Sequence, residues 1–345
     1  MLIKYPRAKP FFSKIDKTTI LKDISDILDT GMLTQGKHVA EFEEQFTAEI
    51  GCTYSVATNS CTSALQIAIE ALGIKNKTIY VTTQTWMSSV NAIILSGNTP
   101  CIIDIDPDTL CMDTNILREK IKKNKNSAVL WVHMAGQISP DILTVKEFCD
   151  TAGVMIIEDC AHAHGASING IKAGNIGAAG CFSFYPTKIM ATGEGGMITS
   201  NNLCVRDNGR MLRDHGTVRN PSKDGLDMGV TAKRVSQNFR MNEMAAILGK
   251  SQLNRLEEYV DKRNAIASLY KQQLTGVPNI RMLPTYSNIV HSYWNFYIVL
   301  TPNINRGEFA KTLLEEYGIQ TANAYDPACH KQKLFKNYSE HCPVA

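Results

Sequence analysis

Lys188 is the residue in this sequence whose surroundings best suit covalent chemistry. It follows a short apolar run at residues 181–184 and a Pro186-Thr187 turn, and Gly195-Gly196 opens a second apolar run soon after it. A lysine held between two buried strands is costly to desolvate, and burial lowers the pKa of its amine. Neutral amines are nucleophiles that form Schiff bases with carbonyl groups. We therefore take Lys188 as a candidate nucleophile.

An acid that suits this lysine ends the preceding apolar run. Residues 154–157 are apolar, and Glu158 and Asp159 follow them directly. A buried aspartate there would need a cationic partner. A Schiff-base lysine and an aspartate that faces a pyridinium nitrogen are together the pair that pyridoxal phosphate (PLP) requires. The sequence therefore predicts a PLP site formed by Lys188 and Asp159.

The segments that must position these two residues alternate between strands and helices. We expect strands at residues 54–58, 79–82, 101–105, 128–132, 154–158, 181–184 and 197–200, and helices at 13–30, 39–50, 62–72, 86–95, 115–122, 140–152 and 203–212. Such alternation predicts an α/β fold with a mainly parallel sheet sandwiched by helices. Ligands of such sheets bind at the carboxyl ends of the strands.

Two further strand ends carry residues that suit a planar, phosphorylated ligand. Thr62 and Ser63 open the helix after the first expected strand, where free N–H groups and the helix dipole favour a phosphate. An ordinary N-cap is the alternative explanation for these hydroxyl residues. After the second strand, Trp86 offers a face on which a ring can stack, with a core tryptophan as the alternative.

His162 and His164 follow Asp159 closely and raise the question of a metal site. No third ligand cluster with zinc spacing follows them, so we expect no metal. A hydrogen-bonding role near a bound ring is the better hypothesis for His162.

Composition and charge exclude several functions. The 345 residues are 44% hydrophobic, which suits one large domain and a smaller one. The net charge of +3 is scattered, so we expect neither a nucleic-acid nor a membrane surface, and residues 120–125 look like a solvated helix end. The ten cysteines contain no C-x-x-C pair, and neither a signal peptide nor an apolar run of about 20 residues is evident. We expect a soluble cytoplasmic protein.

An ordered set of motifs runs through nearly the whole chain. It comprises residues 33–36, Thr62–Leu65, Asp104–Pro107, Glu158–Ala166, Phe182–Phe184 with Lys188, Gly193–Gly196, Arg213 with His215-Gly216, and Asn238–Met241. With these motifs the chain resembles the nucleotide-sugar aminotransferases of the DegT type, which are fold-type I PLP-dependent transferases. Motifs that are weak one by one become specific when they occur in this order.

The resemblance implies catalytic roles for Lys188, Asp159 and His162. Lys188 matches the lysine that forms the Schiff base with PLP and later moves a proton between cofactor and substrate carbons. Asp159 matches the aspartate that keeps the pyridine nitrogen protonated, so that the ring acts as an electron sink. Trp86 matches the aromatic residue stacked on the ring, and His162 a residue near its other face or its hydroxyl.

The resemblance also implies how the phosphate is held. Thr62, Ser63 and Ser183 match phosphate-binding residues, and Asn238 matches an asparagine that reaches the phosphate from the neighbouring subunit. A homodimer with shared active sites follows. Cys61 stands where the family has glycine, which leaves the geometry of the phosphate turn open.

The expected function is a two-stage transfer of nitrogen from an amino acid, with glutamate as the expected donor, to a nucleotide-linked ketosugar in aminosugar and polysaccharide biosynthesis. Three alternatives share the fold. A cyclitol or free ketosugar could be the acceptor, which the sequence does not decide. Related PLP-dependent sugar dehydratases have histidine in place of the lysine, so Lys188 argues against them. A non-catalytic relative would be expected to lack Lys188 or Asp159.

The last third of the chain predicts a second, smaller domain. We expect a large PLP-binding domain at residues 1–249 and a small α+β domain at 250–345, with a helix at 242–270, a strand at 293–300 and a helix at 308–317. The sequence ends at Ala345, where relatives continue, so we expect either a truncated or a naturally short small domain.

Residues 217–235 are rich in glycine, proline and scattered charge, which predicts a mobile loop. In the family this region covers the sugar nucleotide. Lys223, Lys233 or Arg234 could meet its diphosphate, although solvated loop charges are an equally good explanation.

Overall fold

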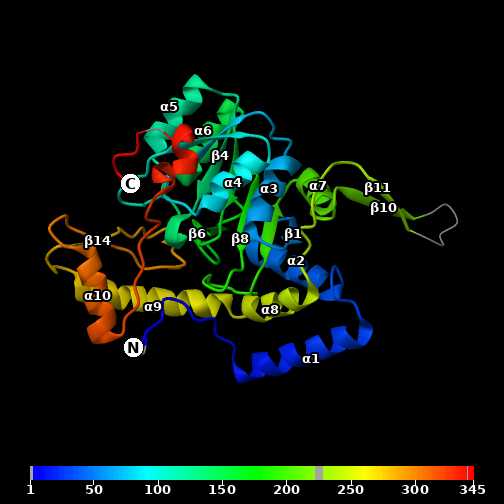
Figure 1. Cartoon of the computed structure of the whole chain (residues 1–345), viewed down its shortest axis with the longest axis horizontal. Coiled ribbons are helices and arrows are strands. Elements are labelled where there is room, and N and C mark those ends of the chain that lie inside the picture. Colours follow the sequence, from blue (N-terminus) through cyan, green and yellow to red (C-terminus); the bar gives the residue numbers. More distant parts are fainter. Residues whose placement is uncertain (1–2, 222–227, 340) are drawn as a thin grey trace.

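A seven-stranded sheet forms the centre of this computed structural model, which describes residues 3–221, 228–339 and 341–345 (Figure 1). The sheet has the strand order β1-β9-β8-β5-β4-β2-β3. Its strands are β1 (Tyr54–Thr58), β2 (Thr78–Thr82), β3 (Thr99–Ile103), β4 (Ser127–Val132), β5 (Met155–Asp159), β8 (Ala179–Ser183) and β9 (Gly196–Ser200). All strands of this sheet run in the same direction except β9, which runs antiparallel to them. The predicted mainly parallel α/β sheet is confirmed, and none of the seven strands expected for it is displaced by more than two residues.

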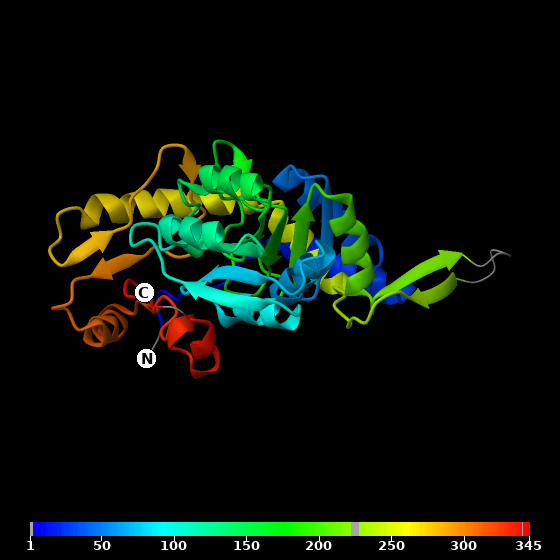
Figure 2. The same cartoon turned by 90° about the horizontal axis from the view of Figure 1, so that it is seen from above.

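Helices cover both faces of the sheet, as Figure 2 shows from above. One face carries α2 (Lys37–Ile50), α5 (Thr114–Lys123) and α6 (Ile142–Ala152), and the other carries α3 (Cys61–Ala71), α4 (Met87–Leu95) and α7 (Leu203–Arg213). Strand β4 shows the alternation that this requires. Val129 and Trp131 lie in the first core, whereas Ala128 and Leu130 lie in the second.

Four phenylalanines fix the strand that leads to Lys188. Phe42 and Phe46 of α2 contact Phe182 and Phe184 at the end of β8, with ring centroids 4.9–5.7 Å apart. All four side chains are fully buried. Each buried ring contributes about 1.5–3 kcal/mol of apolar burial, so the start of the Lys188 loop is firmly placed.

The N-terminal helices have clear boundary signals. α1 (Lys14–Thr30) begins with a capping box between Ser13 and Asp16 and ends at Gly31, which adopts a left-handed conformation. α2 has no side-chain cap of its own. Instead, the Glu243 carboxylate accepts hydrogen bonds from the N–H groups of Gly36, His38 and Val39 at 2.8–3.0 Å. Within the described residues, no helix is both long and apolar enough to span a bilayer.

The C-terminal part differs from prediction in two places. The single helix expected at residues 242–270 is two helices, α8 (Glu243–Leu253) and α9 (Leu256–Leu274), which follow each other along one side of the molecule (Figure 1). They separate at Arg255, whose ψ of 5° is non-helical and whose guanidinium pairs with Asp16.

The strand expected at 293–300 is only β14 (Ile298–Leu300), because Tyr293 has a φ of 45° and the chain there turns into the site described below.

Other elements are β6 (Ser167–Ile168), β7 (Ile171–Lys172), β12 (Ile280–Met282), β13 (Ile289–Val290) and α10 (Arg306–Tyr317), followed by 3-10 turns at Cys329–Lys331 and Lys333–Tyr338. The expected helix ending at Gly318 is confirmed as α10. The division into domains at residue 249 stays a prediction.

The expected loop at residues 217–235 contains a β-hairpin instead. β10 (Thr217–Pro221) pairs antiparallel with β11 (Met228–Ala232), and the hairpin projects from the molecule (Figure 2). Its glycine and proline obscured the strand pattern in the sequence. Lys223 lies outside the described residues.

Candidate active site

Lys188 lies in the turn after β8, with its side chain partly buried. Its amine stands 4.5 Å from the centroid of the Trp294 ring, and the indole N–H of Trp294 donates to the carbonyl of Thr187 at 2.6 Å. Burial lowers the pKa of the Lys188 amine to about 8, although the negative charge of Asp159 opposes this effect. The amine is therefore neutral in a larger fraction of molecules than that of an exposed lysine near physiological pH, and the neutral form is the nucleophile.

Asp159 ends β5, beside the strand that leads to Lys188. Its Oδ2 accepts a hydrogen bond from the Ser89 hydroxyl at 2.7 Å, and its Oδ1 accepts one from the N–H of Ala161 at 3.0 Å. The carboxylate is buried, and burial raises its pKa, while the Ser89 hydrogen bond and the Lys188 charge lower it. The predicted acid and amine are thus close enough for the charge of each to shift the pKa of the other.

His162 lies in a stack of aromatic rings. Its imidazole lies parallel to the Trp294 ring at 3.7 Å, and its Nε2 shares a hydrogen bond of 2.9 Å with the hydroxyl of Tyr325. Burial drives the pKa of His162 far down and that of Tyr325 up, so both side chains are neutral. His162 Nδ1 is buried without a hydrogen-bond partner among the described residues. A neutral imidazole with an open nitrogen suits the predicted hydrogen-bonding role.

The start of α3 has the features of a phosphate site. The Ser60 side chain caps the helix by accepting from the N–H of Ser63. In the described part of the chain, the N–H groups of Cys61 and Thr62 find no acceptor. Their N–H groups and the helix dipole favour an anion.

Ser183 reaches this helix start through its strand partner. Ser183 pairs with Gly196 in the sheet. Gly196 lies so close to the start of α3 that a Cβ added to it would be 2.4 Å from the backbone of Ser60. The strand that pairs with Ser183 therefore packs against the start of α3, where the Ser63 hydroxyl donates to Asn59.

Cys61 does not disturb this helix start. It is the first residue of α3 and has no positive φ, so the site does not need the conformational freedom of glycine. Its side chain is buried, and burial together with the Asp159 charge raises the pKa of its thiol. The helix therefore begins normally with cysteine at this position, and the effect of Cys61 on phosphate binding stays a prediction.

Trp86 and Asn238 lie at the margin of the site. Trp86 immediately precedes α4, is 55% exposed, and has its ring centroid 6.0 Å from that of Tyr325. Asn238 is exposed, and its backbone carbonyl accepts a hydrogen bond of 3.3 Å from the Asn59 side chain. Its contribution to a second subunit stays a prediction.

Of the basic residues that the structure describes after the hairpin, Arg234 has an acidic partner within the chain. Arg234 approaches Glu70 of α3, at 3.7 Å between Nη2 and Oε2. Lys233 is exposed. The sequence hypothesis that Arg234 meets a diphosphate therefore has to compete with an ion pair inside the chain.

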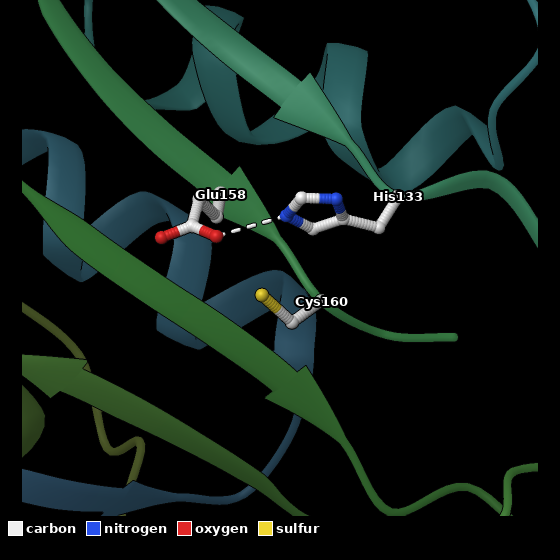
Figure 3. A group of neighbouring side chains, drawn as sticks. All are labelled: His133, Glu158 and Cys160. Atoms are coloured by element: carbon white, nitrogen blue, oxygen red, sulfur yellow. Dashed lines mark hydrogen bonds and ion pairs between the residues drawn. The ribbon is translucent and has the colours of Figure 1, made fainter. Parts of the chain in front are cut away.

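A second acidic group near the site has a structural role. His133, Glu158 and Cys160 lie close together (Figure 3), and their ligand atoms are within 4.8 Å of one another. The Glu158 carboxylate already accepts hydrogen bonds from His133 Nε2 and from the N–H groups of Gly174, Ile176 and Gly177 at 2.6–2.9 Å. Burial also raises the pKa of the Cys160 thiol well above its usual value. These bonds leave no open carboxylate position for a metal.

The two neighbouring histidines have separate environments. His162 faces Trp294, whereas His164 lies against Phe182 and Phe184, where burial lowers its pKa to about 3. A metal ion shared by this pair is therefore not supported by their geometry.

Sequence reasoning missed Ser89, Trp294, Tyr325 and Arg7 as parts of the site. Ser89 follows Trp86 by three residues and shares its helix turn, so the helical period offered a signal. Trp294 and Tyr325 come from the C-terminal region, more than 100 residues from Lys188, and no local pattern connects them with it. Arg7 lies near the N-terminus, with its guanidinium 5.3 Å from the Trp294 ring centroid.

Comparisons with known proteins agree with this arrangement. Residues 14–345 match the model of the DegT/DnrJ/EryC1/StrS aminotransferase family. The chain is 31% identical over 322 residues to a GDP-perosamine synthase of Vibrio cholerae, covering 92% of this chain and 85% of that protein. It is 33% identical over 315 residues to the spore coat polysaccharide biosynthesis protein SpsC of Bacillus subtilis, covering 89% and 80%.

A solved structure of similar shape is the aminotransferase TlmJ of Streptoalloteichus hindustanus, with a TM-score of 0.87 and 26% identity over 100% of this chain and 90% of that one. Likeness in sequence and in structure thus spans nearly the whole chain. The chain therefore belongs to the DegT/DnrJ/EryC1/StrS aminotransferase family, a family of PLP-dependent sugar aminotransferases.

Proposed function

We propose that this chain moves an amino group from an amino acid, with glutamate as the donor, to a nucleotide-linked ketosugar, using PLP. The observation that carries this proposal is the buried pair of Lys188 and Asp159, in which the lysine pKa falls to about 8 and the aspartate pKa rises. The similar protein of Vibrio cholerae is named for a GDP-linked sugar, and SpsC for polysaccharide biosynthesis. Both names support an acceptor of this class.

The residues of the site fit this cofactor. The unpaired N–H groups at the start of α3, with Thr62, Ser63 and Ser183, suit its phosphate. Trp86 and His162 offer aromatic and hydrogen-bonding contacts for its ring. When bound, PLP supplies an electron sink and a carrier for the amino group.

The protein's own groups divide the remaining work. Asp159, held by Ser89 and the N–H of Ala161, is the acceptor that keeps a proton on the ring nitrogen. Lys188 acts first as a nucleophile and then as the base and acid that moves a proton at the substrate carbon. Trp294 fixes the backbone just before this lysine through its hydrogen bond to Thr187.

Covalent capture of the cofactor tests the assignment of Lys188. Purified protein is incubated with PLP, reduced with borohydride and digested, and the modified peptide is identified by mass spectrometry. We expect the adduct on Lys188 and none in Lys188→Ala. An unmodified Lys188, or full amino transfer by the alanine variant, would refute the proposal.

The acceptor class is tested with a panel of substrates. GDP-, UDP- and dTDP-linked ketosugars are compared with free ketosugars and a ketocyclitol, with glutamate or glutamine as donor. Turnover limited to nucleotide-linked acceptors supports the proposal. Preference for unlinked acceptors would favour a cyclitol or free-sugar aminotransferase instead.

We further propose a homodimer in which Asn238 completes the site of the partner subunit. Lys188→Ala and Asn238→Ala chains, each inactive alone, should recover activity when they are mixed and allowed to exchange, because one site per mixed dimer keeps both native residues. No recovery would indicate that both residues act within one chain. All ten cysteines are free thiols, which suits the cytoplasmic location that we also propose.

A further inference from the structure

Arg7 is held in place near Lys188 by backbone pairing. The N–H groups of Lys4 and Tyr5 donate to the carbonyl of Gly318 at 3.1 and 3.0 Å, and the N–H of Gln320 donates to the carbonyl of Tyr5 at 3.1 Å. The Arg7 N–H donates to Gln320 Oε1, also at 3.1 Å. The N-terminal segment is therefore tied to the chain after α10, and the position of Arg7 is not that of a free terminus.

The guanidinium of Arg7 shares an aromatic neighbour with the candidate nucleophile. It lies 5.3 Å from the centroid of the Trp294 ring, and the Lys188 amine lies 4.5 Å from the same centroid. The separation of the two cations therefore cannot exceed the sum of these distances. A cation over an indole face is held in a limited set of orientations, which prepares the guanidinium for a ligand.

Arg7 has no acidic partner in the described part of the chain, whereas several other arginines do. Arg255 pairs with Asp16, and Arg213 and Arg210 pair with Glu43. The Arg7 side chain remains exposed. Its charge also contributes to lowering the pKa of Lys188 and of His162, which agrees with a guanidinium directed toward them.

We propose that Arg7 binds the α-carboxylate of the amino-acid donor. This inference rests on the proposed function. The donor's nitrogen must reach the position at which Lys188 acts, and its carboxylate is attached to the adjacent carbon, so a cation close to Lys188 is well placed to receive it. A guanidinium fork matches a carboxylate with two parallel hydrogen bonds. The diphosphate of a nucleotide sugar is joined to the reacting carbon only through the sugar ring, so it needs a more distant cation than the α-carboxylate does.

The test compares amines with and without the carboxylate. Wild type, Arg7→Gln and the control Lys9→Gln, in the same exposed segment, are loaded with PLP. The rate at which glutamate changes the cofactor absorption is compared with the rate for 4-aminobutyrate, which lacks the α-carboxylate. We expect Arg7→Gln to lower the specificity constant for glutamate about 100-fold, to leave that for 4-aminobutyrate unchanged, and to leave the ketosugar half-reaction unchanged. Lys9→Gln should behave as wild type.

A second measurement does not depend on amino transfer. Removing the Arg7 charge should raise the pH midpoint at which Lys188 captures PLP for borohydride reduction, because a neighbouring cation no longer disfavours the ammonium form. An unchanged midpoint, equal losses for both amines, or a loss confined to the ketosugar half-reaction would each overturn the proposal. The last outcome would assign Arg7 to the diphosphate. Failure of the wild type to fix PLP on Lys188 would instead refute the proposed function itself.

Discussion

Replacing Lys188 by methionine should stabilise the cofactor-free protein near neutral pH. Burial lowers the pKa of the Lys188 amine from 10.5 to about 8, so the folded state disfavours its charged form. One pKa unit corresponds to about 1.4 kcal/mol, so the shift is worth at most about 3.5 kcal/mol of unfolding free energy. Methionine keeps a long apolar side chain and removes the charge.

The pH dependence has a definite sign. Below pH 8 the amine is protonated in the folded and the unfolded state, and the wild type carries the full cost of burying the charge. Between pH 8 and 10.5 the unfolded state binds more protons than the folded state, so wild-type stability rises with pH relative to the variant. The advantage of Lys188→Met is therefore complete at pH 7 and absent above about pH 10.5.

Urea unfolding at pH 7, 8, 9 and 10 measures this difference. Lys22→Met, at an exposed position of α1, is the matched control and should change stability by less than about 0.5 kcal/mol at every pH. Subtracting the change in unfolding free energy for Lys22→Met from that for Lys188→Met removes the contribution of other titrating groups. A gain for Lys188→Met that is the same at pH 7 and pH 10, or a variant less stable than wild type at pH 7, would refute the argument.

Three further substitutions test the support around the site. Ser89→Ala removes the hydroxyl donor to Asp159 and should slow steady-state amino transfer about tenfold or more, whereas Ser88→Ala on the same helix should not; equal rates would contradict the role of this bond. Glu243→Gln weakens the cap of α2 and should lower the unfolding free energy in urea by about 1–3 kcal/mol, and an unchanged value would show that the cap is dispensable. Trp294→Phe keeps a ring but loses the indole N–H, so borohydride capture of PLP should be slower while circular dichroism is unchanged; an unchanged capture rate would count against positioning.

The sheet could be predicted from sequence because its signals are local. Each strand is a short apolar run between turn residues, and the strands of a parallel sheet end at a common edge. Asp159 and Lys188 were placed correctly by this rule, because β5 and β8 are neighbours in the sheet. The helices were equally clear where a cap marks them, as at Ser13 and Gly31.

The second wall of the site could not be predicted in this way. Trp294 follows Tyr293, whose positive φ turns the chain out of the expected strand. The backbone N–H of Trp294 donates to the carbonyl of Ala135. Ser292 anchors the same segment by donating to the carbonyl of His162 at 3.0 Å. These contacts join residues that are far apart in the sequence, and no periodicity in the sequence around residue 294 predicts them.

Some motif residues proved to be structural rather than chemical. Arg213, which belongs to the ordered motif set, donates to the buried Glu43 carboxylate, which also accepts a hydrogen bond from the N–H of Ala57. This network holds α2, β1 and α7 together beneath the helix start that suits the phosphate. A motif residue can therefore serve the site by fixing the backbone around it.

The burial and the charges of Lys188 and Asp159 favour the binding of a cationic ring between them. Desolvation lowers the pKa of Lys188 and raises that of Asp159, and the attraction between their opposite charges offsets this effect only in part. A protonated pyridine nitrogen beside Asp159 would supply the missing cation, and a carbonyl beside Lys188 would use the amine without requiring a charge. One heterocycle that carries both groups would remove both penalties at once. The pair of residues whose burial is unfavourable for stability is thus the same pair that we propose binds such a ligand.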